Sequence, residues 1–373
     1  MIIISTILIA IYTIAILWLL KGLLTNNWLE SNGAPSQTVN GISVIVAFRN
    51  ERENIPKLIA SLEAQDLPHE FWEAILVDDG STDSGFDLVM SCKSQLPLKP
   101  LVLPDGQAGK KQALLYGLSA ASFDTVVFTD ADCTHTPQWL SSIRECMGNA
   151  YFLQGEVKPQ FEKGSIISMF EALDYLSLMA VSAASFAVGK PVIASSANLV
   201  FRRSKVNVDA KALRTDIVSG DDMFLLHHAK TITGLRFRFL ASPRVAAYTS
   251  FSGGIKGFVL RRSRWASKAT AYTDSLTLLL SFLVFTLNFW IVLLAILSVL
   301  GVIAFYLPIS LLAAKAMVDL PFLAYYLFKT KQQNLMAVFI PLQILYPFYI
   351  TFAAILGLIK GTTWKGRINS WQN

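Results

Sequence analysis

The sequence predicts an α/β domain built on a mainly parallel sheet, with one transmembrane helix before it and about three after it. The chain has 373 residues, of which 53% are hydrophobic, and a mean hydropathy of +0.47. That is too apolar for an ordinary soluble protein, and most of the excess lies at the two ends of the chain. Between the ends, short apolar runs alternate with helical stretches, which is typical of a parallel sheet covered on both faces.

The N-terminal segment, residues 1–24, is expected to be an uncleaved membrane anchor. No charge occurs from Ile2 to Leu20, and about 20 apolar residues span the hydrocarbon core of a bilayer. The first charge, Lys21, follows the apolar run, whereas a cleaved signal peptide has basic residues before its run. Because positive residues stay on the cytoplasmic side, Lys21 predicts that the next domain faces the cytoplasm, in a multi-pass protein of the inner (cytoplasmic) membrane of the cell.

A C-terminal transmembrane region is expected over residues 276–360. One apolar block, Leu276 to Phe328, is long enough for two helices with a break near Pro308, and a second block runs from Leu335 to Ile359. Three crossings would place the basic residues that begin at Lys360 outside, against the positive-inside rule. The last segment is therefore either a third span or a re-entrant or interfacial segment.

Two charges lie in the middle of one of these apolar spans. Lys315 and Asp319 are four residues apart, so they can pair on one helix face. An unpaired charge at that depth is costly, and intramembrane charges also mark functional paths. The two readings are a structural ion pair and a path for an acceptor.

The middle domain, residues 41–250, alternates between strands and helices from its first residues. The expected order is strand 42–48 (ISVIVAF), helix 55–64, strand 74–79 (AILVDD), helix 83–93, strand 100–104 (PLVLP), helix 110–121 and strand 125–130 (TVVFTD). Parallel strands need such crossover helices, and the crossovers are right-handed. The three scattered cysteines have neither metal-ligand spacing nor an even count, so reduced thiols are expected.

Five acidic residues are expected at one edge of this sheet, because ligands bind outside the carboxyl ends of parallel strands. Glu51 follows the first strand, Asp78 and Asp79 end the second, and Asp130 and Asp132 follow the fourth. Each acidic turn alone also has a plain explanation as a turn former. Together the carboxylates repel one another unless a cation compensates them. Mg²⁺ or Mn²⁺ suits such oxygen ligands and shares substrate phosphates, whereas the histidines lack the spacing of zinc ligands.

Six motifs then occur in order between Gly41 and Lys268. They are VIVAFRNE, LVDDGSTD, AGKKQALLYGL, FTDADC, SGDDMFLL and RRSRW. Each motif alone is weak or moderate, but their order and spacing make the set specific. As a set they resemble the membrane-bound family 2 glycosyltransferases, inverting enzymes with a Rossmann-like catalytic domain of the GT-A type. The resemblance covers about three fifths of the chain.

The resemblance implies roles for particular residues. Those expected to bind the nucleotide sugar are Glu51, Asp78, Asp79, Lys110, Asp130, Arg261, Arg264 and Trp265. Asp132, together with Asp130, matches the Asp-x-Asp element that holds the metal. The alternative for Lys110 is a solvated residue at a helix start. SSANLVFRR resembles the acceptor-side turn of the family, with Ser196 where glycine is expected.

The motif SGDDMF supplies the expected catalytic residues. The resemblance makes Asp222 the general base and Asp221 its support. An acceptor hydroxyl is a poor nucleophile at neutral pH, and a positioned carboxylate that takes its proton contributes about 10² to 10⁴ in rate. The alternative is structural, since Ser219 can cap a helix whose macrodipole both aspartates favour.

Residues 254–272 have two compatible readings. RRSRW matches a family motif that lies near the acceptor and the diphosphate. The same stretch repeats apolar residues near the helical period among basic ones, which is typical of an interfacial amphipathic helix. The net charge is +6, but basic and aromatic residues are not interleaved as they are in nucleic-acid-binding proteins. Anionic lipid is therefore the expected partner of the positive charge, and nucleic acid is not.

The expected activity is transfer of a sugar from a nucleotide-diphospho-sugar, with Mg²⁺ or Mn²⁺, to a membrane-associated acceptor. A lipid acceptor suits the small set of C-terminal spans and the tail WKGR. A growing polysaccharide suits RRSRW, which is typical of processive synthases. A third reading is a membrane protein that binds nucleotide sugars without turnover.

Overall fold

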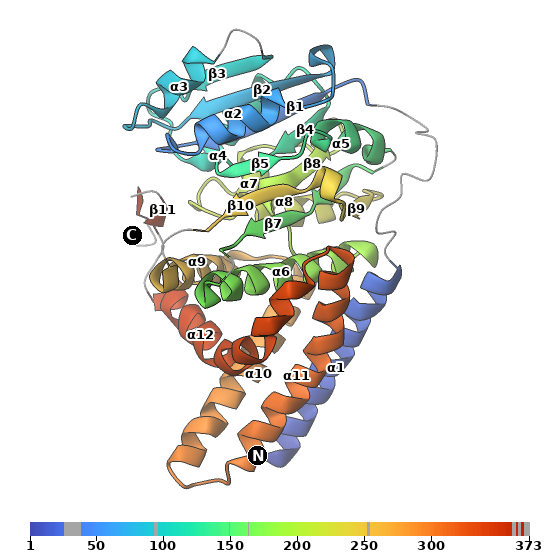
Figure 1. The fold of residues 1–373 in the computed structure, drawn as a ribbon, viewed down its shortest axis with the longest axis vertical. Coiled ribbons are helices and arrows are strands. Elements are labelled where there is room, and N and C mark those ends of the chain that lie inside the picture. Colours follow the sequence, from blue (N-terminus) through green and yellow to red (C-terminus); the bar gives the residue numbers. More distant parts are fainter. Residues whose placement is uncertain are drawn as a thin grey trace.

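The computed structural model describes residues 1–25, 39–92, 96–148, 150–162, 164–251 and 254–359. It also describes the backbone of two short strands, β11 (Thr363–Trp364) and β12 (Arg367–Ile368). Lys93 and Lys360, where two expected elements end, lie outside the described residues. Figure 1 shows an α/β domain above a bundle of long helices, with the N-terminus at the far end of the bundle.

A seven-stranded sheet forms the centre of the α/β domain, in the order β3-β2-β1-β4-β8-β6-β9. The strands are β1 (Ile42–Phe48), β2 (Trp72–Asp78), β3 (Leu98–Val102), β4 (Thr125–Phe128), β6 (Phe152–Gly155), β8 (Leu199–Arg202) and β9 (Phe237–Leu240). Only β8 runs against the others. The expected mainly parallel sheet is confirmed.

Helices cover both faces of this sheet because its central strand is apolar on both sides. Val44 and Val46 of β1 belong to one core with Leu58 of α2 (Ile55–Glu63), and Ile45 belongs to the other core with Leu114 of α4 (Lys110–Ser119). Successive strand residues point to opposite faces, so one strand serves both cores. The other helices of the domain are α3 (Gly85–Ser91), α5 (Trp139–Met147), α7 (Ala210–Leu213) and α8 (Asp221–Lys230).

A small second sheet closes the domain next to the bundle. Its order is β5-β10-β7, with β5 (Cys133–His135), β7 (Val157–Gln160) and β10 (Ala247–Ser250). β5 follows the Asp-x-Asp turn directly, and it pairs antiparallel with β10. That pairing fixes the backbone on the far side of the turn, so the two aspartates are held between two sheets.

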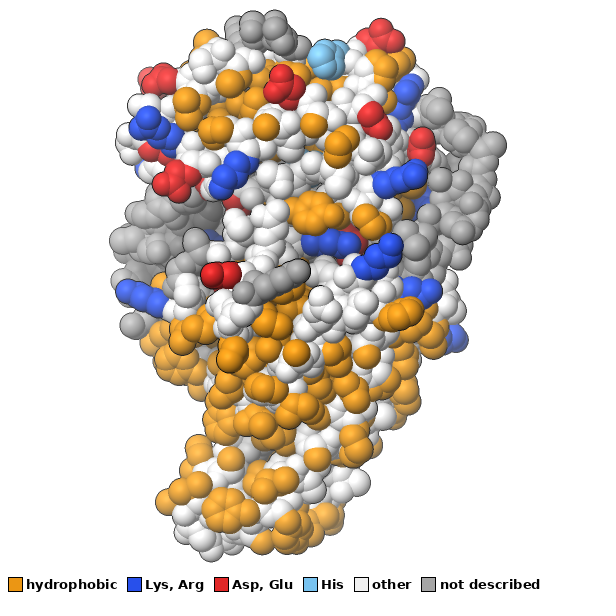
Figure 2. Space-filling view, in the orientation of Figure 1, with side chains coloured by type: hydrophobic (Ala, Val, Ile, Leu, Met, Phe, Trp, Pro, Cys, Tyr) orange, Lys and Arg blue, Asp and Glu red, His pale blue; other side chains and the backbone are white. Residues whose placement is uncertain are grey.

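Five helices in the described part of the chain are long and apolar enough to cross a membrane. They are α1 (Ile2–Thr25), α6 (Ile166–Ala187), α10 (Ser275–Val299), α11 (Tyr306–Lys329) and α12 (Phe339–Ile359). In Figure 2, apolar side chains cover the bundle, and the charged side chains gather on the α/β domain and at its junction with the bundle. One N-terminal and three C-terminal apolar helices are thus confirmed.

The expected break near Pro308 is present and occupies residues 300–305. α10 ends at Val299 and α11 begins at Tyr306, so Pro308 lies inside the first turn of α11. Proline is tolerated there because the N–H that it lacks has no partner in the first turn of a helix. The hydropathy profile cannot distinguish a proline that begins a helix from one that ends it.

Two helices lie across the junction between the domain and the bundle (Figure 1), namely α6 and α9 (Gly254–Ser267). α6 packs against β7 and β9 on one side and against α1 on the other. At its contact with α1, a Cβ added to Gly22 would lie 2.3 Å from the carbonyl oxygen of Ala184. α6 therefore connects the α/β domain to the helix bundle, although its composition would also allow it to span a membrane.

Both ends of α12 return to the side of the α/β domain. The short helix before it, η5 (Gln333–Val338), contacts α6, and α12 itself packs along α9. Near its end, a Cβ added to Gly357 would lie 2.5 Å from the carbonyl oxygen of Ser263 in α9. Pro347 lies in the middle of the helix. The last apolar segment therefore begins and ends beside helices that adjoin the α/β domain.

The expected ion pair inside the bundle is present and has two further partners. Lys315 Nζ lies 2.7 Å from Asp319 Oδ2 and 2.9 Å from Gln343 Oε1. Tyr12 donates to Asp319 Oδ1 at 2.6 Å. The cluster therefore joins α1, α11 and the descending part of α12.

Candidate active site

One cavity of about 1120 Å³ runs from the edge of the α/β domain into the bundle. At the domain end it is lined by Glu51, Lys110, Asp130, Asp132, Asp221, Asp222, Arg261, Arg264 and Trp265. At the bundle end it is lined by residues of α1, α10, α11 and α12, among them Tyr12, Phe282, Lys315 and Leu342. The fold thus gathers nine of the predicted site residues around one space that continues between the apolar helices.

Lys110 is the central cation of the site. It begins α4, and its Nζ lies 2.7 Å from Asp130 Oδ1, 3.0 Å from Asp221 Oδ2 and 2.9 Å from Ser196 Oγ. Burial lowers the pKa of Lys110, but its attraction to Asp130 and Asp221 outweighs burial and raises this pKa above its ordinary value. The alternative of a solvated lysine at a helix start is therefore wrong. Ser196, in the position where glycine was expected, supplies a hydroxyl to this cation.

Asp130 and Asp132 follow β4 as expected and present carboxylates to the cavity. Burial, and next the charges of Asp130 and Glu51, raise the pKa of Asp132 to about 6. Within the described residues, no three His, Cys, Asp or Glu side chains come together as a metal cluster. The protein thus offers two hard oxygen ligands with excess negative charge beside an open cavity, which fits Mg²⁺ or Mn²⁺ completed by phosphate oxygens.

Asp78 and Asp79 lie at the same edge but do not line the cavity. Phe48, the last residue of β1, pairs with Asp78, the last residue of β2. Asp78 accepts hydrogen bonds from the backbone N and the hydroxyl of Ser81, and Asp79 accepts one from Gly109 N at 2.8 Å. In this arrangement the acidic pair braces its own turn and the turn that leads into Lys110.

Asp221 and Asp222 begin α8, and their environments differ. Asp221 is 7% exposed; although burial raises the pKa of a carboxyl group, the charges of Lys110 and Lys268 outweigh it and hold the pKa of Asp221 at about 2. Asp222 accepts a hydrogen bond from Met223 N at 2.7 Å. Burial, reinforced by Asp221 and opposed by Lys268, raises the pKa of Asp222 above its ordinary value. Opposed pKa values in neighbouring acids are typical of an acid–base site.

Side chains of the RRSRW motif both form contacts with α6 and line the cavity. Arg261 forms an ion pair with Glu171 of α6 and also borders the cavity. Arg264 faces the cavity within electrostatic reach of Asp130 and Asp221. Trp265 packs on Tyr175 of α6, with ring centroids 6.0 Å apart. The motif therefore lies both at the interface and in the site, so both sequence readings describe part of its geometry.

Three residues near the site were not predicted as part of it. Glu171 and Asp174 of α6 form ion pairs with Arg261 and Arg262 of α9. Lys268, which the sequence indicated only as a charge of an amphipathic helix, lines the cavity. Its position four residues after Arg264 is the one sequence signal that places it on the same side of the helix.

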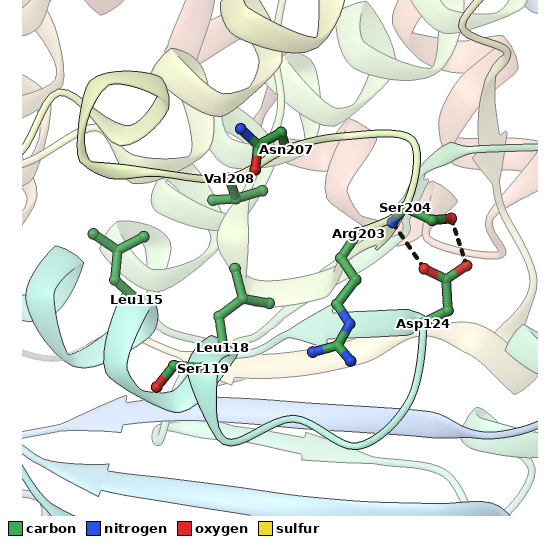
Figure 3. A pocket seen from close by; sticks show the side chains of 8 residues that line it. All are labelled: Leu115, Leu118, Ser119, Asp124, Arg203, Ser204, Asn207 and Val208. Atoms are coloured by element: carbon green, nitrogen blue, oxygen red, sulfur yellow. Dashed lines mark hydrogen bonds between the residues drawn. The ribbon is translucent and has the colours of Figure 1, made fainter.

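A second, smaller hollow of about 480 Å³ lies at the far end of α4 from Lys110. Figure 3 shows Asp124 there, accepting hydrogen bonds from the backbone N and Oγ of Ser204, both at 2.8 Å. Arg203 donates to the carbonyl oxygen of Ala121. Because these polar groups already pair with one another and no predicted site residue lines the hollow, it is not the candidate active site.

Two curated relatives are similar to parts of the chain. The glycosyltransferase AglE of Haloferax volcanii is 26% identical over 190 residues, which is 50% of this chain and 60% of that protein. An undecaprenyl-phosphate 4-deoxy-4-formamido-L-arabinose transferase of Pectobacterium carotovorum is 32% identical over 123 residues, which is 32% of this chain and 37% of that protein. The chain thus matches less than two thirds of the length of either relative.

A solved structure supports the fold over nearly the whole chain. The mannosyltransferase PcManGT from Pyrobaculum calidifontis, in complex with GDP-Man and Mn²⁺, superposes with a TM-score of 0.58 at 21% identity. The match covers 91% of this chain and 95% of that one. At this identity the likeness concerns the fold alone, and it confirms the expected GT-A architecture.

Family descriptions cover most of the α/β domain and reach into the bundle. The description "Glycosyl transferase family 2" matches residues 43–162. The description "Glycosyl transferase family group 2" matches residues 125–317, which is more than half of the chain. Both ranges include the Asp-x-Asp turn, and the second includes Asp222 and RRSRW. The chain belongs to the family 2 glycosyltransferases.

Proposed function

We propose that the protein is an inverting glycosyltransferase that moves a sugar from a nucleotide-diphospho-sugar to a lipid acceptor drawn from the membrane. The observation that carries this proposal is the continuity of the cavity from Asp130, Asp132 and Asp222 to the side chains between α1, α10 and α11. A lipid can keep its tail among the apolar helices while its head reaches the carboxylates. A water-soluble acceptor would not need the part of the cavity that lies among the apolar helices.

The donor is proposed to bind at the domain end of the cavity. Asp130 and Asp132 would hold Mg²⁺ or Mn²⁺, which would neutralise the departing diphosphate. Lys110 keeps Asp130 oriented through its 2.7 Å contact. Glu51 borders the same end, and Asp79 fixes the turn before Lys110. These residues bind and orient the donor, while Arg264 adds positive charge opposite the acids.

Asp222 is proposed to take the proton of the acceptor. Its backbone is fixed at the first turn of α8, and its raised pKa makes it a better proton acceptor than an ordinary aspartate. Asp221 stays ionised because Lys110 compensates it, and it holds that lysine in place. As the acceptor oxygen bonds to the sugar carbon, the bond from that carbon to the diphosphate breaks and the proton passes to Asp222.

A lipid acceptor is favoured over a growing polysaccharide. The two relatives are a glycosyltransferase and a transferase whose name includes undecaprenyl-phosphate, a lipid phosphate. α12 begins and ends on the side of the α/β domain, which leaves few helices to build a conduit for a long polymer. We further propose that the domain faces the cytoplasm, with Lys21, Lys329 and Lys331 on that side of the inner membrane.

Two variants with matched controls test the proposal. Asp132→Ala and Asp222→Asn are expected to abolish sugar transfer in membranes supplied with nucleotide sugars and Mn²⁺, while both proteins still insert and fold. Asp87, which is exposed on α3, provides the controls Asp87→Ala and Asp87→Asn, which should retain wild-type activity. Full transfer by either site variant would remove the role assigned to that residue. A ladder of products would favour a processive polymerase, and nucleotide-sugar binding without turnover would favour a non-catalytic protein.

A further inference from the structure

Lys268 is a buried cation that the proposed mechanism does not use. It begins the short helix η4 (Lys268–Ala271) after α9, is 8% exposed and lines the cavity together with Asp222. Its stem crosses the start of α8 at Gly220, where an added Cβ would lie 3.0 Å from Lys268 Cδ. Gly220 has a φ of +88°, which also favours glycine. Glycine at position 220 thus leaves room for the Lys268 side chain to cross the start of α8.

The ammonium group of Lys268 differs from the other buried amines in its partners. Lys110 has three oxygen partners, Lys111 donates to Arg214 O at 2.8 Å and Lys158 to Thr330 O at 3.1 Å. For Lys268 Nζ, no hydrogen bond or ion pair forms with any residue that the structure describes. Lys268 Nζ is not fully enclosed by protein and remains open to the cavity that this residue lines, and an ammonium carries three donors. A ligand anion in the cavity would supply the missing acceptors.

The charge around Lys268 also favours an anion at this point. Burial lowers the pKa of Lys268 from its ordinary value, while Asp222 and Asp221 oppose that shift. Asp221 is already paired with Lys110. Arg264, four residues earlier, faces the same cavity and makes no side-chain hydrogen bond or ion pair within the described ranges. Two cations therefore point into one space without an oxygen partner of their own.

The position of Lys268 identifies the side from which the anion arrives, whereas Arg264 lies within electrostatic reach of both aspartate pairs. The lining next to Lys268 continues through Thr270 and Tyr272 to Thr277, in the first turn of the apolar helix α10. Asp130 and Asp132, where the donor diphosphate is proposed to bind, lie instead beside Lys110. Lys268 thus lies between Asp222 and the part of the cavity that opens among the membrane helices.

We infer that Lys268 binds a phosphate group of the lipid acceptor beside the oxygen that receives the sugar. This inference rests on the proposed function. The phosphate can be a phosphomonoester, whose own oxygen attacks the sugar carbon, or the phosphodiester of a phospholipid whose head carries the attacking hydroxyl. In both cases the new bond joins the acceptor oxygen to the sugar carbon, the diphosphate leaves with the electron pair, and any proton on the attacking oxygen passes to Asp222.

A binding experiment tests the site without turnover. The full-length protein in detergent is titrated with polyprenyl phosphate or phosphatidylglycerol, each beside its uncharged counterpart, polyprenol or diacylglycerol, and thermal stabilisation is followed. The wild type should prefer one phosphate lipid over its counterpart by at least tenfold, the scale of a charge-assisted hydrogen bond. Lys268→Met should lose that preference, Lys268→Arg should keep most of it, and the exposed control Lys211→Met should match the wild type.

Binding of UDP and GDP with Mn²⁺ separates the acceptor phosphate from the donor diphosphate. We expect Lys268→Met to change nucleotide affinity less than twofold while the KM for the phosphate lipid rises at least tenfold. Weaker nucleotide binding with unchanged lipid binding, or no change in either, would overturn the inference, as would equal wild-type affinity for phosphate and uncharged lipids. A wild type that prefers a phosphate lipid yet turns over no donor would refute the proposed function and leave the phosphate site standing.

Discussion

Replacing Lys110 by methionine removes the central cation of the site and keeps most of its apolar stem. Its Nζ lies 2.7 Å from Asp130 and 3.0 Å from Asp221, so the variant removes the ion-pair partner of Asp130 and leaves Asp221 with Lys268 as its remaining cation. The destabilisation is largest at Asp221, because this residue is only 7% exposed and its carboxylate cannot turn to solvent. The expected result is a less stable protein that also fails to bind nucleotide sugar.

The structure sets the size of this effect. A fall of the Asp221 pKa from 3.8 to about 2 corresponds to roughly 2 kcal/mol of interaction with its cations. Lys268 also contributes to this shift and remains in the variant, so we expect a loss of about 3 kcal/mol, the lower end for buried pairs that lose one partner. Because this pKa is depressed, the stabilisation is present above about pH 4 and is lost as pH falls toward 2.

Thermal unfolding of the detergent-solubilised protein measures the loss. We expect Lys110→Met to melt roughly 4 °C below the wild type, and Lys110→Met/Asp221→Asn to recover part of that difference because one uncompensated charge is removed. Lys211→Met, at an exposed position, should melt with the wild type. The reasoning is refuted if Lys110→Met melts within about 2 °C of the wild type, or if adding Asp221→Asn lowers the melting temperature further.

Three further predictions concern the base and the bundle. Asp222→Asn should lower kcat by about 10² to 10⁴ and remove the acid limb of the pH profile, which in the wild type falls as pH drops through the raised pKa of Asp222; steady-state assays decide, and an unchanged limb would contradict the assignment. Lys315→Met should cost about 3–5 kcal/mol in thermal unfolding and Lys315→Met/Asp319→Asn less, because the single variant leaves a buried charge; equal losses would exclude the pair. Gly357→Leu should separate α12 from α9 at Ser263 and lower the melting temperature, whereas unchanged melting would exclude that contact.

Local sequence pattern predicted the first half of the α/β domain well. β1, β2 and β4 and the helices between them follow runs whose periodicity is complete within a few residues, as in ISVIVAF. The second half was less regular because β6, β8 and β9 do not alternate simply with crossover helices and are defined by pairing with distant strands. Hydropathy found the apolar helices at the two ends of the chain, but composition alone cannot distinguish a span from a re-entrant helix in the last segment.

The site was predicted residue by residue from motifs, and its internal contacts were not. The sequence placed Lys110 at a helix start, but its partners Ser196 and Asp221 come from turns far along the chain. Asp78 and Asp79 were expected at the nucleotide, and the structure places them off the cavity, in hydrogen bonds that only the folded turns create. The sequence did not predict Lys268 as a site residue, because a charged residue on an amphipathic helix gives the same pattern whether it faces solvent or a binding site.

The central claim, sugar transfer to a membrane lipid, is tested most directly by mass analysis of the lipid fraction. The full-length protein is incubated with a panel of nucleotide sugars, a lipid extract and Mn²⁺ or Mg²⁺, beside the Asp222→Asn variant. One lipid species should gain the mass of a single sugar from one donor, in the wild type and not in the variant. An unchanged lipid fraction with every donor, or equal product from Asp222→Asn, would contradict that claim.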